Sequence, residues 1–111
     1  MILVTGSAGH LGEALMRTFR ADGVPARGMD IKPSPYTDIV ASIADRDAVD
    51  AAMAGVTYVL NTATLHKPHV VTHSHQQFVE TNITGTLNLL EAAATRGVRS
   101  LVFTSTTSTF G

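Results

Sequence analysis

Short apolar segments alternate with longer amphipathic segments along the chain of 111 residues. Four segments are predicted to be buried strands and cover residues 2–5, 26–31, 57–60 and 100–104. Helical spacing of apolar residues predicts a first helix over Leu11 to Asp22 and a short second helix from Asp45 through Met53. A long third helix is predicted between Ser74 and Gly97.

The predicted helix ends carry residues that commonly begin or end helices. Asp45 suits an N-cap, and Ser74-His-Gln-Gln77 fits a capping box. Glycines 23, 55 and 97 follow the three helices, where a left-handed residue commonly ends a helix. The face of the long helix is predicted from its apolar positions, which are Val79, Ile83, Leu87, Leu90 and Ala94.

Strands that alternate with helices of this length pair in parallel through right-handed crossovers. The sequence therefore predicts an α/β fold with a Rossmann-type, doubly wound parallel sheet in which four strands are present. The length suits one domain. With 44% hydrophobic and 15% charged residues, the composition argues against disorder.

Three glycines lie between the first strand and the first helix, at Gly6, Gly9 and Gly12. In a strand–loop–helix unit, the first glycine permits a tight turn and the second lets the backbone approach a pyrophosphate. The third lets the helix pack close to the strand. The free N–H groups of the helix N-terminus then face the phosphates. This pattern predicts dinucleotide binding, and a purely structural turn is the alternative.

Asp30 strengthens the dinucleotide interpretation, because it lies at the end of the next strand and eighteen residues after Gly12. An acid at about this separation accepts hydrogen bonds from the ribose hydroxyls. Its charge would repel a 2′-phosphate, so NAD is favoured over NADP. Lys32 follows two residues later, either as an ordinary solvated lysine or as a residue that softens this preference.

The remaining composition excludes several classes. A net charge of −1 gives no electrostatic case for nucleic acid or an acidic membrane surface, and no apolar run approaches a membrane span. The absence of cysteine excludes disulfides and thiolate chemistry and fits a cytoplasmic protein. His66, His69, His73 and His75 cluster without an interleaved carboxylate, so a substrate-side loop near the cofactor is favoured over a metal site.

Three ordered motifs resemble those of the extended short-chain dehydrogenases/reductases, the NAD-dependent epimerase/dehydratase group. The loop Thr5-Gly-Ser-Ala-Gly-His-Leu-Gly12 is similar to the family's Thr-Gly-x-x-Gly-x-x-Gly. Asn82-Ile-Thr-Gly-Thr86 is similar to its Asn-x-x-Gly-Thr helix, and residues 101–111 are similar to its fourth strand and the following Ser-Ser segment. The resemblance covers essentially the whole chain.

Carried over by position, the resemblance implies a set of cofactor contacts. The pyrophosphate would be contacted by Gly6, Gly9, His10, Leu11 and Gly12. Asp30 would hold the adenosine ribose. Ser42 and Ile43 would lie beside adenine, although serine replaces the family's usual acid. The nicotinamide ribose would lie beside Thr62, Ala63 and Thr64.

The same resemblance makes Thr106 the catalytic hydroxyl that orients a substrate hydroxyl or carbonyl. Thr106 belongs to a run of six Ser and Thr residues, from Thr104 to Thr109. The run is either a solvated linker or a strand end whose hydroxyls, Thr104 included, face the cofactor. Asn82 would make a structural hydrogen bond near this site.

The family's Tyr-x-x-x-Lys pair is missing. A phenol is a poor base at neutral pH unless a neighbouring cation lowers its pKa. Tyr36 and Tyr58 are followed four residues later by Val40 and Thr62. We therefore expect residues 1–111 to be the N-terminal part of a single dinucleotide-binding domain, truncated before the remaining strands and the substrate region.

The resemblance implies an NAD-dependent oxidoreductase that acts on a sugar or nucleotide-sugar hydroxyl by hydride transfer, with this fragment alone inactive. A non-catalytic dinucleotide-binding or redox-sensing module is the alternative. The expected partner is a small-molecule substrate. The last predicted strand would present an apolar edge, so we also expect a homo-oligomer or pairing through that edge.

Overall fold

The computed structural model describes residues 1–62 and 83–103. In chain order its elements are β1 (Ile2–Thr5), α1 (His10–Ala21), β2 (Ala26–Asp30), β3 (Ile39–Val40), α2 (Arg46–Ala52), β4 (Tyr58–Asn61), α5 (Gly85–Arg96) and β5 (Ser100–Phe103). The strands pair in parallel in one sheet of order β3-β2-β1-β4-β5. The predicted α/β class with a doubly wound, Rossmann-type sheet is confirmed.

The sheet contains a fifth strand, β3, which the sequence pattern did not predict. Ile39 and Val40 pair with Met29 and Asp30 of β2. The N–H of Ala41 continues the ladder by donating to the Asp30 carbonyl at 2.9 Å. Two residues are too few for a visible alternation of apolar and polar positions, so this strand depends on its neighbour rather than on a local pattern.

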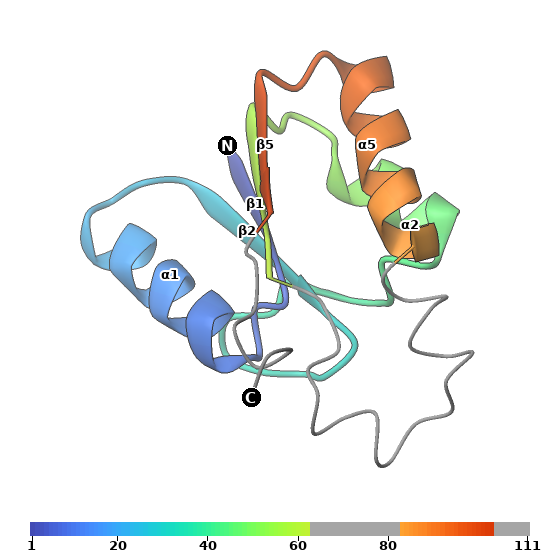
Figure 1. Cartoon of the computed structure of the whole chain (residues 1–111). Helices are drawn as coiled ribbons and strands as arrows, with labels where there is room; N and C mark the ends of the chain where they lie inside the picture. Colours follow the sequence, from blue (N-terminus) through green and yellow to red (C-terminus); the bar gives the residue numbers. More distant parts are fainter. Residues whose placement is uncertain (63–82, 104–111) are drawn as a thin grey trace, which may run out of the picture.

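The two faces of the sheet are covered differently. Figure 1 shows α1 on one face and α2 with α5 on the other. The apolar core lies between the sheet and the α2–α5 pair. Its buried members are Leu3, Met29, Ile43, Val49, Ala52, Met53, Val56, Val59, Leu89, Ala92 and Ala93. Most of the buried apolar side chains therefore stabilise the packing of α2 and α5 against the sheet.

The predicted apolar face of the long helix is wrong for the described part of α5. Ile83, just before α5, and Leu87 and Leu90 within it are 56%, 51% and 44% exposed, and Ala94 is exposed as well. The buried positions of α5 are Gly85, Leu89, Ala92 and Ala93. Apart from Leu89, the inner face consists of small residues that let the helix approach its neighbours closely, and Leu87 and Leu90 lie outside. Val79 lies outside the described residues.

The predicted helix caps agree better with the structure than the predicted apolar face does. The Asp45 carboxylate accepts hydrogen bonds from the N–H groups of Asp47 and Ala48 at 3.1 and 3.2 Å, which confirms it as the N-cap of α2. Gly97 ends α5 in the left-handed conformation at φ 71°. The capping box at 74–77 lies outside the described residues. Among the helices of the described ranges, none has the length and hydropathy needed to cross a membrane.

The crossover from β2 to β3, residues 31–38, contains no helix. It passes over Gly28 of β2, where a Cβ atom would overlap the Tyr36 carbonyl oxygen. The Gly28 N–H donates to the Asp38 carboxylate at 2.8 Å, and the Asp38 N–H donates back to the Gly28 carbonyl at 2.8 Å. A glycine in β2 therefore makes room for a crossover much shorter than a usual strand–helix–strand connection.

Candidate functional site

The carboxyl ends of the parallel strands bring the candidate residues to one edge of the sheet. β1 ends before the glycine loop, residues 6–12, and β2 ends at Asp30. β3 ends before Ser42 and Ile43, and β4 ends before Thr62. In open parallel sheets of this kind, ligands bind outside the carboxyl ends of the strands. The structure thus brings the described candidates together.

The glycine loop is built so tightly that two of its glycines have no room for a side chain. Gly6 has a φ of 82°, and a Cβ atom there would overlap Thr62. A Cβ atom on Gly12 would overlap the Gly6 carbonyl oxygen, so Gly12 lets α1 start close to β1. The conformation required at Gly6 strongly favours glycine. These two constraints hold the loop in one shape.

The N-terminus of α1 is open toward the same edge. Gly9 is the N-cap and forms no side-chain cap hydrogen bond. Its N–H donates to the Gly6 carbonyl at 3.0 Å, and its carbonyl accepts the N–H of Glu13 at 2.9 Å. The N–H groups of a helix's first turn have no partner within the helix, and they carry the positive end of its dipole. This end of α1 therefore suits an anion.

Asp30 is directly connected to the glycine loop. One carboxylate oxygen accepts the N–H of Ala8 at 2.9 Å, and the other accepts the N–H of Lys32 at 2.9 Å. A carboxylate has about four acceptor positions, so acceptor capacity remains for a ligand's hydroxyls. The two backbone donors fix the carboxylate between the loop and the end of β2.

A chain of hydroxyl groups fastens the crossover at 31–38 to the glycine loop. The buried Ser7 hydroxyl lies 2.8 Å from the Thr37 hydroxyl, which lies 2.7 Å from the Ser34 hydroxyl. From α1, Arg20 donates to the Pro35 carbonyl at 2.9 Å and lies 4.9 Å from the centre of the Tyr36 ring. Loop, crossover and helix therefore support one another.

Arg17 lies on the outer side of the same region, 6.0 Å from the centre of the Tyr36 ring. Hydrogen bonding to Tyr36, and then to Glu13, raises the pKa of this guanidinium above its usual value.

Thr62 has a role that the sequence did not indicate. Its hydroxyl donates to the Thr5 carbonyl at 2.6 Å and lies 3.3 Å from the Gly6 carbonyl oxygen. The Thr5 hydroxyl in turn donates to the side-chain oxygen of the buried Asn61. The end of β4 thus supports the turn at Gly6. Thr62 is far from Gly6 in the sequence, so only the three-dimensional structure shows this contact.

Ser42 and Ile43 follow β3 directly. The Ser42 hydroxyl accepts the N–H of Ala44 at 3.0 Å, and its carbonyl accepts the N–H of Asp45 at 3.0 Å. Ile43 is only 4% exposed, and its carbonyl accepts a hydrogen bond from the Asn88 amide of α5 at 2.9 Å. Both residues therefore occupy a fixed turn between β3 and α2.

Several predicted site residues lie outside the described residues. They are Ala63, Thr64, His66, His69, His73, His75, Asn82, Thr104 and Thr106. In the part of the chain that the structure describes, no group of three or more His, Asp or Glu side chains is placed to hold a metal ion.

The chain is similar to proteins that share this arrangement. The sequence model of the NAD dependent epimerase/dehydratase family matches residues 2–111. A 4-epimerase of Escherichia coli O157:H7, which acts on N-acetyl-alpha-D-glucosaminyl-diphospho-ditrans,octacis-undecaprenol, is 30% identical over 99% of this chain and 33% of its own length. The 3-beta-hydroxysteroid dehydrogenase of Mycolicibacterium neoaurum is 32% identical over 96% of this chain and 32% of its own length.

A solved structure extends the likeness to the fold. The crystal structure of a short-chain dehydrogenase/reductase superfamily protein from Agrobacterium tumefaciens with bound NAD has a TM-score of 0.85 and 36% identity. The match covers 96% of this chain and 32% of that one. The chain spans about a third of the length of these relatives. Given the glycine loop, the acid that ends β2 and a family match along residues 2–111, the protein belongs to the NAD dependent epimerase/dehydratase family.

Proposed function

We propose that this chain forms the NAD-binding portion of an oxidoreductase of the epimerase, dehydratase or dehydrogenase type. The observation that carries the proposal is the link between Asp30 and the glycine loop, in which the Ala8 N–H donates to the carboxylate at 2.9 Å. This contact joins the proposed ribose acceptor to the loop before the helix N-terminus that is proposed to bind the pyrophosphate. That pairing is the one a dinucleotide requires.

The residues present fit the cofactor. Gly9 carries no side chain, which lets a pyrophosphate approach the backbone, and His10, Leu11 and Gly12 supply the first turn of α1. Asp30 accepts the hydroxyls of the adenosine ribose. Its charge disfavours the 2′-phosphate of NADP, so NAD is the proposed cofactor.

For the whole protein we propose oxidation of a sugar or nucleotide-sugar hydroxyl in the cytoplasm. The sugar is supported by the epimerase relative, whereas the steroid dehydrogenase has similar identity. Sequence similarity over residues 1–111 therefore supports the choice of cofactor more strongly than the choice of substrate. Bound NAD supplies the hydride acceptor. Thr62, Ala63 and Thr64 would lie near the nicotinamide ribose, Thr104 near the cofactor, and Thr106 would orient the substrate.

Residues 1–111 alone are proposed to bind NAD without turnover. Tyr58 is the first residue of β4, so it lies at the amino-terminal edge of the sheet, opposite the candidate site. Tyr36 lies in the crossover beneath Arg20. Neither tyrosine is followed by lysine four residues later. Neither is therefore placed to serve as the acid/base of the family's reaction.

Calorimetric titration with NAD and NADP tests this proposal. We expect NAD to bind about tenfold more tightly than NADP. In Asp30→Ala, NAD affinity should fall about ten- to a hundredfold, because hydrogen bonds to a charged acceptor are lost. Asp22→Asn, which removes an exposed charge after α1, is the matched control and should leave both affinities unchanged. No detectable NAD binding at millimolar concentration would overturn the proposal.

Catalysis is tested separately in the same protein. If residues 1–111 oxidise a sugar or nucleotide sugar while reducing NAD, the proposed inactivity is wrong. If a protein that contains this chain binds NAD and carries no Tyr-x-x-x-Lys pair, the non-catalytic binding module replaces the oxidoreductase.

A further inference from the structure

We propose that Asn88 of α5 is a positioning residue for the adenine end of the NAD site and acts through the backbone of Ile43. The proposal rests on the NAD site described above. It gives α5, a helix on the core face of the sheet, a part in cofactor selection.

The order of the strands indicates where adenine lies. The pyrophosphate is assigned to the glycine loop after β1, and the ribose to Asp30 at the end of β2. β3 is the next strand in the sheet, and the Ala41 N–H after it donates to the Asp30 carbonyl at 2.9 Å. A dinucleotide that follows the strand ends in this direction brings its base to residues 41–43.

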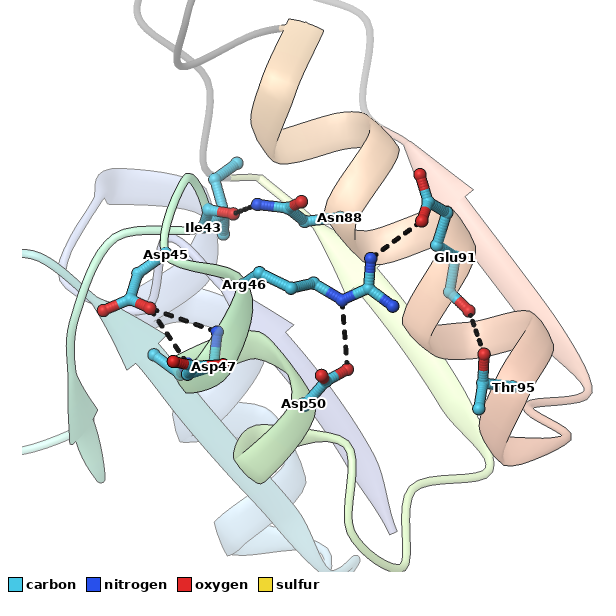
Figure 2. A network of polar contacts seen from close by, with 9 residues as sticks. Ile43, Asp45, Arg46, Asp47, Asp50, Asn88, Glu91 and Thr95 are labelled. Atoms are coloured by element: carbon cyan, nitrogen blue, oxygen red, sulfur yellow. Dashed lines mark hydrogen bonds and ion pairs between the residues drawn. The ribbon is translucent and has the colours of Figure 1, made fainter.

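Ile43 is held from α5 in two ways. The Asn88 amide donates to its carbonyl at 2.9 Å, as Figure 2 shows. Its side chain is buried so closely against Gly85 that a Cβ atom on that glycine would overlap the isoleucine side chain. Both the backbone and the side chain of Ile43 are therefore fixed by a helix that lies far away in the sequence.

The N–H of Ile43 is the chemically important group of this turn. Among the described residues, no hydrogen bond from this N–H is found, although the residue is only 4% exposed. A backbone donor in such a place requires a partner. Adenine offers an acceptor at its N1 atom, whereas hypoxanthine carries a hydrogen there. A fixed N–H at this point thus distinguishes the two bases.

The other contacts between α2 and α5 provide a comparison. Figure 2 shows Arg46 between Asp50 of α2 and Glu91 of α5. The guanidinium lies 3.2 Å from the Asp50 carboxylate and 2.8 Å from that of Glu91. Hydrogen bonding to Glu91, and then to Asp50, raises the pKa of Arg46. These side chains are 39–60% exposed, and exposed ion pairs contribute little to stability. Glu91 joins the same two helices through Arg46 and not through a hydrogen bond to Ile43, which makes it a matched control.

The test compares NAD with its hypoxanthine analogue by calorimetric titration. The unmodified protein should prefer NAD about tenfold. Asn88→Ala should weaken NAD binding about five- to tenfold and reduce the preference to about twofold, because one positioned hydrogen bond is lost. Asn88→Asp keeps the shape but not the donor, and it should behave in the same way. Glu91→Gln should retain both the affinity and the preference.

The outcomes separate this inference from the NAD site itself. If the unmodified protein binds neither dinucleotide, the proposed function fails. If it binds NAD but shows no preference over the hypoxanthine analogue, the inference is overturned while the NAD site stands. If the Asn88 variants weaken both ligands by the same factor, Asn88 supports only the fold, and the inference is again overturned.

Discussion

The two faces of the sheet are built by different means. On the α2–α5 face, Leu3, Met29 and Leu89 belong to a continuous buried apolar cluster. On the α1 face, Met16 is buried outside that cluster, and glycines and hydroxyl groups supply further contacts, as at Gly12 and at the Ser7–Thr37 pair. The free energy of apolar burial is non-directional, whereas hydrogen bonds require particular distances and angles. The α2–α5 face thus contributes most of the stability, whereas the contacts on the α1 face fix the positions of the glycine loop and the crossover.

Gly12→Ala should have the largest effect, because the new Cβ atom would overlap the Gly6 carbonyl oxygen. We expect NAD affinity to fall at least roughly a hundredfold, and the free energy of unfolding to fall by about 3 kcal/mol. Gly55→Ala is the control on the other face. That glycine has a φ of 74° but open space around it, so the variant should lose stability and retain NAD binding. Calorimetric titration and thermal unfolding measure both properties.

Leu89→Ala should have the next largest effect. It should lower the free energy of unfolding and leave NAD affinity unchanged. Leu89 is fully buried, and its truncation leaves a cavity that costs about 3 kcal/mol of the free energy of unfolding. Leu90→Ala, at a position 44% exposed, should cost less than about 1 kcal/mol. Chemical denaturation measures both. A large loss of NAD affinity in folded Leu89→Ala would show that the two faces are not separable.

Thr37→Val should have the smallest effect. Removing its hydroxyl leaves the buried Ser7 hydroxyl without this partner, which costs about 1–2 kcal/mol. NAD affinity should fall a few-fold, because the crossover beside Asp30 loosens. Thr95→Val removes a similar hydroxyl from the exposed surface of α5 and should change neither property. Equal effects of the two substitutions on NAD affinity would contradict the proposed division between the faces.

Features that depend on neighbouring residues were predictable from the sequence. Asp45 caps α2 with its own side chain, and the φ of 71° at Gly97 follows from glycine's lack of a Cβ atom. The glycine loop and Asp30 were also predictable, because their spacing reflects a fixed strand–loop–helix geometry. The contact of Asp30 with the Ala8 N–H agrees with that spacing.

Features that depend on close approach between distant segments were not predictable. The helical spacing of apolar residues predicted that Leu87 and Leu90 face inward, yet the buried positions of α5 are Gly85, Leu89, Ala92 and Ala93. The hydrogen bond from Asn88 to Ile43 joins residues far apart in the sequence, and no local sequence pattern predicts it. The hydroxyl of Thr62 at the Gly6 turn is a third example.

The bond between Asn88 and Ile43 also bears on the order in which the site forms. β1, the glycine loop, α1, β2 and Asp30 all lie within the first 30 residues, so their mutual contacts become available early during synthesis. The turn at Ile43 acquires its partner only when α5 has been made. In a nascent chain, the proposed contacts to phosphates and ribose would therefore form before the proposed contact to the base.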